Sequence, residues 1–429
     1  MSVEKLSWLA LGAPLALAAC LTPARVPLPE ALVGDLSRRA EVARELRFEA
    51  PVPAWGVSQE GVAGLLREEL EAGWSDEDVR RSESLGIALG LLPAGTDLRR
   101  ALLAFQSEAV AGFYTPIGDQ LYVVVPPDRV ESITPADRAI VVHELVHALQ
   151  AQHTRLLDVT LGLDDSDDLL FAVGALLEGD ALLASFLDRE VHESIARTAP
   201  PDFAAEFELE WSGPPEAGVP RLIRDSFLIQ YPTGYALADA LVERGGVAAL
   251  DAAELDPPLS SEMLLHPERY LDPSARRPLS VPVLEAERIA PGCRESARNR
   301  YGELGLRVWA LDGGRPRAHA EAAADGWDGD AALLLDCPAG VAFAWVIDFD
   351  AAVDAAEFER EARAIAAERP GLELVRSGVR VVVSRNLPPG GPAAALAAPV
   401  ERFDDLDAFL AARPDVLERA RARRARAAR

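Results

Sequence analysis

Residues 134–153 read TPADRAIVVHELVHALQAQH, and this stretch indicates a well-defined helix. Thr134 is a suitable N-cap, Pro135 suits the first helical position, and Asp137 completes a capping-box pattern. Apolar residues then fall on several faces of the expected helix, so that little of it can face water. The sequence therefore predicts a helix that lies in the core of its domain.

The centre of this helix carries the pattern His143-Glu144-Leu145-Val146-His147. Residues four apart lie on one face of a helix, so both imidazoles point to the same place. Zinc binds imidazole nitrogens in a tetrahedral array, and a glutamate beside such a pair can accept a proton from zinc-bound water. Without a metal, three polar side chains would have to be satisfied inside an apolar helix, which is costly. We therefore predict a Zn2+ site with His143 and His147 as ligands and Glu144 as the general base.

His153 is one candidate for a third ligand. Its spacing from His143 is that of HExxHxxGxxH, the pattern of metzincins, but Gln150 stands where that pattern has glycine. The glycine lets the chain turn sharply, so that the third histidine reaches the metal. In a helix that continues past Gln150, His153 lies more than one turn beyond His147 and too far from the metal. We expect His153 to be a structural residue near the helix end.

Glu178 is the other candidate. It lies within the apolar run Leu169–Leu183, which also contains Asp180. Two acids argue against a membrane span, so we expect a buried helix of the protein core. An ionised carboxylate there needs a partner; zinc is a good one, and the alternative is an arginine such as Arg138 or Arg189. We predict Glu178 as the third ligand.

Four segments together resemble a group of bacterial and archaeal HExxH proteins related to the gluzincins: HELVHALQAQH at 143–153, ALLEGDA at 175–181, YPTGY at 231–235 and SEMLLHPERY at 261–270. The likeness covers roughly residues 100–280. It implies a zincin fold, with a glutamate ligand on a helix that follows the HExxH helix, but it implies no substrate. In such a site, Gly179 would let the two helices approach closely, and Asp180 could accept a hydrogen bond from a ligand histidine.

A peptidase of this kind also needs a donor for the oxyanion. We consider Tyr231, Tyr235, His266 and Tyr270, and we take Tyr231 and His266 as the catalytic candidates. The β-like run Gln120–Val125 precedes the motif helix and is expected to be the edge strand that pairs with an extended peptide.

The first twenty residues have the features of an export signal. A short apolar stretch follows Lys5 and ends in Leu17-Ala18-Ala19-Cys20. The stretch is too short for a transmembrane helix, and its end resembles the lipobox of bacterial lipoproteins. The resemblance implies a signal peptide at 1–19, a lipid on Cys20, and an exported protein anchored to a cell-envelope membrane, on its periplasmic or extracellular face.

The remaining chain suggests two domains. Of its 429 residues, 49% are hydrophobic and 26% charged, as in a folded globular protein, and the net charge of −26 argues against a nucleic-acid partner. We predict an α+β fold with a spacer at 20–58, a mainly helical zincin-like domain with a small edge sheet at 59–280, and a smaller α+β accessory domain at 281–412. The basic tail at 413–429 is expected to be a solvated or frayed helix.

Within the accessory domain, the apolar runs Leu304–Leu311, Ala332–Leu335, Val341–Asp348 and Val379–Ser384 are expected to be strands, with a helix at 352–367. Cys293 and Cys337, left once Cys20 is assigned to lipid, could form a disulfide or be two buried thiols.

These features predict a zinc-dependent metallopeptidase that hydrolyses peptide bonds of peptides or proteins in the cell envelope. One alternative is a catalytically silent zinc-binding envelope lipoprotein that acts in binding or assembly. Another is zinc-dependent hydrolysis of a non-peptide bond, such as a cell-wall amide.

Overall fold

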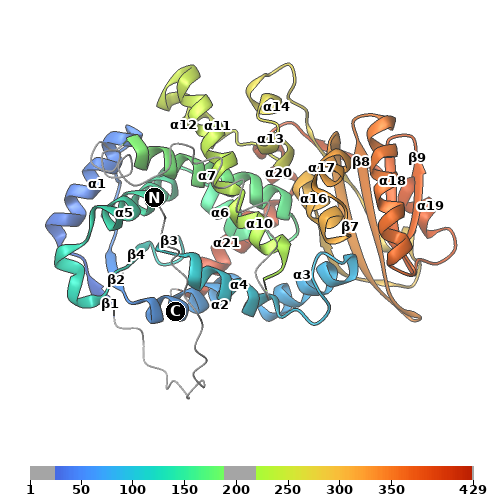
Figure 1. The fold of residues 1–429 in the computed structure, drawn as a ribbon, viewed down its shortest axis with the longest axis horizontal. Coiled ribbons are helices and arrows are strands. Elements are labelled where there is room, and N and C mark those ends of the chain that lie inside the picture. Colours follow the sequence, from blue (N-terminus) through green and yellow to red (C-terminus); the bar gives the residue numbers. More distant parts are fainter. Residues whose placement is uncertain (1–24, 188–218, 428–429) are drawn as a thin grey trace, which may run out of the picture.

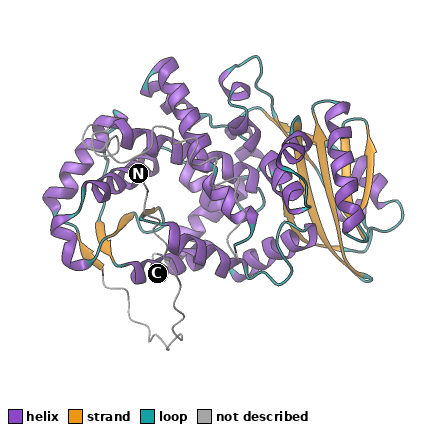
Figure 2. Ribbon diagram, viewed as in Figure 1, coloured by secondary structure: helices purple, strands orange, loops and turns teal. Residues whose placement is uncertain are grey.

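The computed structural model describes residues 25–187 and 219–427. Helices predominate in the N-terminal part, and a large sheet organises the C-terminal part (Figures 1 and 2). The expected α+β class is therefore confirmed. The predicted signal peptide and Cys20 lie outside the described residues.

A small sheet of four strands lies in the N-terminal part, in the order β1-β2-β4-β3. The outer pairs, β1 with β2 and β3 with β4, are antiparallel, whereas β2 and β4 are parallel. The strands are β1 (Arg25–Pro27), β2 (Ala54–Val57), β3 (Gly112–Thr115) and β4 (Gln120–Val124).

The segment expected to be a spacer at 20–58 is, from residue 25 onwards, part of this folded unit. It supplies β1 and β2, and between them α1 (Glu30–Arg44) packs against the motif helix. Leu36 and Ala40 of α1 are fully buried. The spacer prediction was wrong because the abundant prolines and charges of this segment obscured its few core positions.

The expected edge strand is also corrected. The run Gln120–Val124 is β4, which lies between β2 and β3 and has no free edge. The edge strands of this sheet are β1 and β3, and β3 is the one that lies against the motif helix.

Helices surround this sheet and form the rest of the N-terminal part. The motif helix is α5 (Pro135–His153), with the predicted capping box between Thr134 and Asp137 present. The others are α2 (Gln59–Gly73), α3 (Asp76–Leu89), α4 (Leu98–Ala109), the 3-10 turn η1 (Pro127–Ser132), α6 (Leu156–Gly162), α7 (Asp167–Leu187), α10 (Arg221–Leu228), α11 (Gln230–Gly245), α12 (Val247–Leu255), α13 (Ser261–Leu265) and α14 (Glu268–Leu271).

The helix α7 is the central element of the N-terminal part. It is long and apolar enough to cross a membrane, but 72% of its most apolar window is buried inside the protein. Its closest neighbour is α11: a Cβ on Gly179 would lie 2.1 Å from the backbone of Gly234, and one on Gly234 would lie 1.8 Å from the carbonyl oxygen of Ala175. Gly179 thus permits the approach of α11, rather than of the motif helix as expected.

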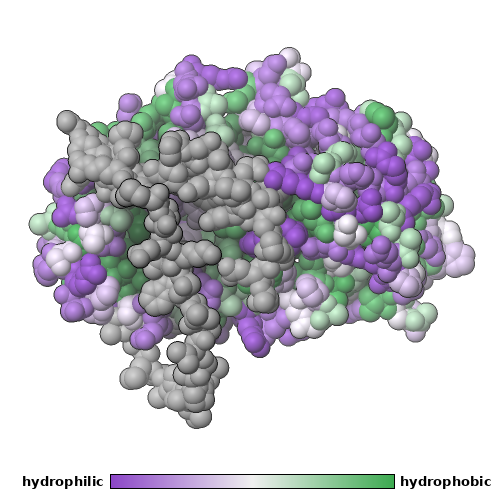
Figure 3. All heavy atoms as spheres, in the orientation of Figure 1, coloured by the Kyte–Doolittle hydropathy of each residue, from purple (hydrophilic) through white to green (hydrophobic). Residues whose placement is uncertain are grey.

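The C-terminal sheet has seven strands, in the order β11-β5-β7-β8-β10-β9, with β6 paired to β7. Its strands are β5 (Leu279–Pro282), β6 (Arg294–Asn299), β7 (Trp327–Cys337), β8 (Gly340–Phe349), β9 (Glu373–Ser377), β10 (Arg380–Arg385) and β11 (Val400–Phe403). Helices pack on it: α15 (Ala286–Ile289), α16 (Gly302–Asp312), α17 (Arg317–Ala324), α18 (Ala352–Glu368), α19 (Gly391–Leu396) and α20 (Leu406–Ala412). Hydrophilic side chains are numerous on the face of this part drawn in Figure 3.

The expected strand at Leu304–Leu311 was wrong, because this run lies in the helix α16. The other three strands and the helix at 352–367 are confirmed. Cys293 and Cys337 form a disulfide between the start of β6 and the end of β7.

The basic tail forms a helix as expected, α21 (Pro414–Ala427), but this helix packs against α6 instead of being solvated. A Cβ on Gly162 would lie 1.9 Å from the carbonyl oxygen of Val416, so the two helices touch through their backbones. Arg419 donates to the carbonyl oxygen of Gly162, and the side chain of Arg423 is only 3% exposed. The expected solvation of the tail was wrong because these arginines are paired inside the fold.

The two parts share one hydrophobic core. Residues of α7, α16, β7 and α18 belong to the same buried cluster. The predicted boundary at 280/281 falls inside β5, which pairs with both β7 and β11.

Candidate metal centre

The helices α5 and α7 bring His143, His147 and Glu178 together. The Nε2 atom of His143 lies 3.2 Å from Oε2 of Glu178 and 3.2 Å from Nε2 of His147. The Nε2 atom of His147 lies 3.5 Å from the same carboxylate oxygen. These three side chains form a cluster that could hold a metal ion.

The donor spacing fits a tetrahedral metal. Ligand atoms at ~2.0–2.1 Å from one zinc ion lie about 3.3 Å from one another in a tetrahedral array. The three distances between His143, His147 and Glu178 fall around that value. Two imidazole nitrogens and one carboxylate oxygen also form the donor set of many catalytic zinc sites, where a fourth position stays open.

The electrostatics of the cluster favour a cation. Burial would raise the pKa of Glu178, but His147 and His143 hold it well below its usual range. Burial would lower the pKa of His147, but the charge of Glu178 raises it to about 9. A divalent cation bound at the cluster would compete with a proton for His147.

Glu144 lies on the side of α5 that faces the edge strand β3. Its side chain is buried and accepts a hydrogen bond from the backbone N–H of Tyr114. Burial raises the pKa of this carboxyl, although His143 and His147 pull it down. A carboxylate with a raised pKa is suited to accept a proton near neutral pH.

Of the four oxyanion candidates, the structure brings Tyr231 to the cluster. Tyr231 lies at the start of α11 and lines the same pocket as the three donors. The charge of Glu178, together with burial, raises the pKa of its hydroxyl well above the usual value. The hydroxyl therefore stays protonated and can donate a hydrogen bond.

His266 is not at this site, which corrects the prediction. Its Nε2 atom lies 3.1 Å from a carboxylate oxygen of Glu303, a fully buried residue of α16. Tyr270 donates to the backbone carbonyl of Asp256, and the ring of Tyr235 packs edge-on against Phe186. The segment 261–270 belongs to α13 and α14, which connect the two parts instead of facing the cluster.

His153 also points away from the cluster. Its Nε2 atom lies 2.7 Å from the backbone carbonyl of Arg47. The helix continues to His153, as we expected because position 150 is a glutamine and not a glycine. Among the described residues, Glu178 pairs with two histidines; Arg189 lies outside them.

The cluster opens into a pocket of about 730 Å3. Among the described lining residues, the acidic side chains are Glu144 and Glu178. The remaining walls are mainly apolar and include Leu66, Phe105, Phe113, Ile140, Leu157, Leu170, Leu177, Leu182, Phe186, Phe227 and Leu228. The backbone of β3 forms part of the wall beside Glu144, through Gly112 and Tyr114.

Two contributors to the site, β3 and Gln150, were not predicted from the sequence. One is β3, whose four residues are too few for a clear alternating pattern. The other is Gln150, which is fully buried and whose Oε1 atom lies 2.8 Å from Nδ1 of His147. A glutamine three residues after a ligand histidine, on the buried face of the same helix, is the signal that could have found it.

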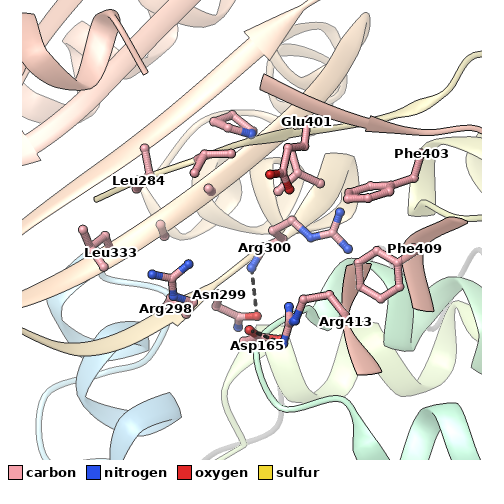
Figure 4. Close-up of a pocket in the computed structure, with 15 residues that line it drawn as sticks. Asp165, Leu284, Arg298, Asn299, Arg300, Leu333, Glu401, Phe403, Phe409 and Arg413 are labelled. Atoms are coloured by element: carbon pink, nitrogen blue, oxygen red, sulfur yellow. Dashed lines mark hydrogen bonds and ion pairs between the residues drawn. The ribbon is translucent and has the colours of Figure 1, made fainter. Parts of the chain in front are cut away.

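A second cavity, of about 130 Å3, lies at the junction of the two parts (Figure 4). Arg413 donates there to Asp165, and Arg300 donates to Ser166. The guanidinium of Arg300 also lies over the ring of Phe409. These contacts join the segment between α6 and α7 to β6, α20 and α21.

Comparisons with known proteins match the C-terminal part of the chain. Residues 287–416 match a family described as a domain of unknown function (DUF8575). The matched segment begins within α15 and ends in α21, and it does not include the donor cluster. Comparisons with curated proteins and with solved structures found no match.

Proposed function

We propose that the protein is a zinc-dependent metallopeptidase whose centre consists of His143, His147, Glu178 and Glu144. The observation that carries the proposal is the spacing of the three donor atoms, at 3.2–3.5 Å, beside a buried glutamate and an apolar pocket. When bound, zinc would lower the pKa of a water molecule and polarise a carbonyl group.

The residues of the chain then have separate roles. His143, His147 and Glu178 would hold the metal. Glu144 accepts the proton of the attacking water and delivers it to the leaving amine. Tyr231, kept protonated next to Glu178, donates a hydrogen bond to the oxyanion.

The surroundings of the cluster favour an extended peptide with bulky apolar side chains. The edge strand β3 lies next to Glu144 and, within the described residues, has no further strand on its outer side; an extended peptide can pair with such an edge. Phe105, Phe113 and Phe227 line the pocket beside it. As part of the same proposal, the protein is exported and anchored by a lipid on Cys20, so that its substrates are peptides or proteins of the cell envelope.

The variant Glu144→Gln tests the catalytic role. We expect it to bind zinc as the wild type does and to lose about 10²–10⁴-fold in kcat on peptides with large apolar residues, because general base catalysis is removed. Zinc content and cleavage of a peptide library measure the two properties separately. If wild type and variant both bind zinc and neither cleaves any peptide, a zinc-binding protein that acts in binding or assembly replaces the peptidase.

A further inference from the structure

A continuous chain of buried polar contacts runs from His147 to the N-terminal helix α1. Nδ1 of His147 lies 2.8 Å from Oε1 of Gln150, and Nε2 of Gln150 donates to Oδ2 of Asp180 at 2.7 Å. The other carboxylate oxygen of Asp180 lies 2.7 Å from Nε of Arg44. Gln150, Asp180 and Arg44 are each at most 1% exposed.

The partners of Gln150 fix the orientation of its amide group. Its nitrogen donates both to Asp180 and, at 3.1 Å, to the backbone carbonyl of Leu177. Both partners are pure acceptors, so the nitrogen must face them and the oxygen must face His147. An amide oxygen can only accept, and Nδ1 of His147 therefore carries a proton. The lone pair available for a metal is consequently on Nε2, the atom that faces His143 and Glu178.

At the far end of the chain of contacts, Arg44 connects the three helices α1, α7 and α12. Arg44 is the last residue of α1, and it also pairs with Asp251 at 2.8 Å and lies 3.6 Å from Glu254, both on α12. Asp180 therefore cannot turn away from Gln150 without breaking its contact with a buried arginine. Leaving a charge buried and unpaired is strongly unfavourable.

We propose that Gln150 is a positioning residue for the metal ligand His147, and that Asp180 and Arg44 keep Gln150 in place. This inference rests on the proposed metal centre. Asp180 thus acts on the histidine through Gln150 instead of accepting its proton directly. Groups that orient a metal ligand in this way typically contribute about 10–100-fold to metal affinity.

Two substitutions separate positioning from packing. Gln150→Leu fills a similar volume but offers no acceptor to Nδ1 of His147. Gln150→Glu keeps an acceptor there but places a second carboxylate beside Asp180. A packing role predicts that leucine is tolerated better than glutamate in the buried site. A positioning role predicts the reverse for zinc affinity.

The test is a competition between each metal-free protein and a zinc chelator, together with the visible absorption of the Co2+-substituted forms. We expect Gln150→Leu to bind zinc about 10–100-fold more weakly and to change the Co2+ spectrum, and Gln150→Glu to recover most of the affinity. Gln152→Leu is the matched control, because Gln152 lies two residues further on, is half-buried, and donates to the carbonyl oxygen of Ala50 instead of contacting a proposed ligand. Thermal unfolding of each metal-free variant identifies any variant that fails to fold. If one of the two Gln150 variants does not fold, the other still tests whether His147 needs an acceptor at this position.

The outcomes are distinguishable. Unchanged zinc affinity and an unchanged Co2+ spectrum in a folded Gln150→Leu variant would overturn the positioning role and leave the metal centre standing. Weaker binding by Gln150→Glu than by Gln150→Leu would also overturn it. Failure of the wild type to bind zinc would overturn the proposed centre, and the inference with it.

Discussion

At Glu178 a single carboxylate oxygen faces two imidazole nitrogens from the neighbouring helix. Its ionised form is stabilised by these two groups against the cost of burial. His153, by contrast, is engaged with a backbone carbonyl on the far side of α5. We therefore expect the two candidates for the third ligand to differ in what their removal does to zinc affinity.

The variants Glu178→Ala and His153→Ala form a direct comparison. We expect Glu178→Ala to lower zinc affinity by about 100-fold or more, because one donor and its charge are lost, whereas His153→Ala keeps wild-type affinity. Zinc content per chain after dialysis against a weak chelator measures both. Loss of zinc in the His153 variant alone would contradict the assignment of Glu178.

At the residue scale, the predictable features were those that depend on one helix. His143 and His147 meet because they are four apart on α5, and the buried acid Glu178 was recognisable from its apolar neighbours. Gln150 was missed because the groups that fix its amide nitrogen, Leu177 and Asp180, belong to α7. His266 was placed wrongly because its partner Glu303 lies 37 residues away. Contacts between distant segments cannot be inferred from local patterns.

At the scale of helices and strands, the elements that could be predicted were those with a clear capping motif or apolar period in their own sequence. The helix α5 begins at its capping box and ends at His153 as expected. The helix α16 was mistaken for a strand because nearly all of it is buried, so its apolar run lacks a helical period. The strands β1 and β2 have three and four residues, too few for a recognisable alternation.

The contact between α7 and α11 provides a prediction for Gly179. Gly179→Ala places a methyl group 2.1 Å from the backbone of Gly234, so the helices must separate. We expect the free energy of unfolding to fall by about 1–3 kcal/mol or more. Denaturant unfolding of the metal-free protein measures this change.

Gly34→Ala is the matched control for this substitution. Gly34 lies inside the helix α1, and an added Cβ there meets nothing within 4 Å. Its replacement by alanine should raise the stability by roughly 0.5–1 kcal/mol, through helix propensity alone. Equal effects of the two substitutions on the free energy of unfolding would show that a methyl group at position 179 fits between α7 and α11.

At the scale of the whole molecule, Asp168 links the two parts. It is buried at the start of α7, and it accepts a hydrogen bond from the backbone N–H of Ser261. It also lies against Gly302 at the start of α16, where an added Cβ would be 1.8 Å from Oδ1 of Asp168. Burial raises the pKa of its carboxyl from 3.8 to about 7.

The raised pKa of Asp168 predicts a pH dependence of stability. The folded protein binds this proton more tightly than the unfolded chain, so the contribution is fully present below pH 3.8 and is lost as the pH rises through about 7. Between pH 5 and pH 8 the wild type should lose about 2–3 kcal/mol through this group, and Asp168→Asn should lack that loss. The difference between the two proteins in denaturant unfolding at both pH values isolates the contribution, and parallel profiles would argue against it.

The incorporation of β1 into the N-terminal sheet limits how far the folded protein could lie from a membrane. If Cys20 carries the lipid, residues 21–24 are all that separate the anchor from the first paired residue, Arg25. The five residue steps from Cys20 to Arg25 reach about 17 Å when fully extended. The lipid and these few residues would then form a short tether that holds the sheet close to the bilayer surface. Such a tether would restrict the protein to substrates that come close to that surface.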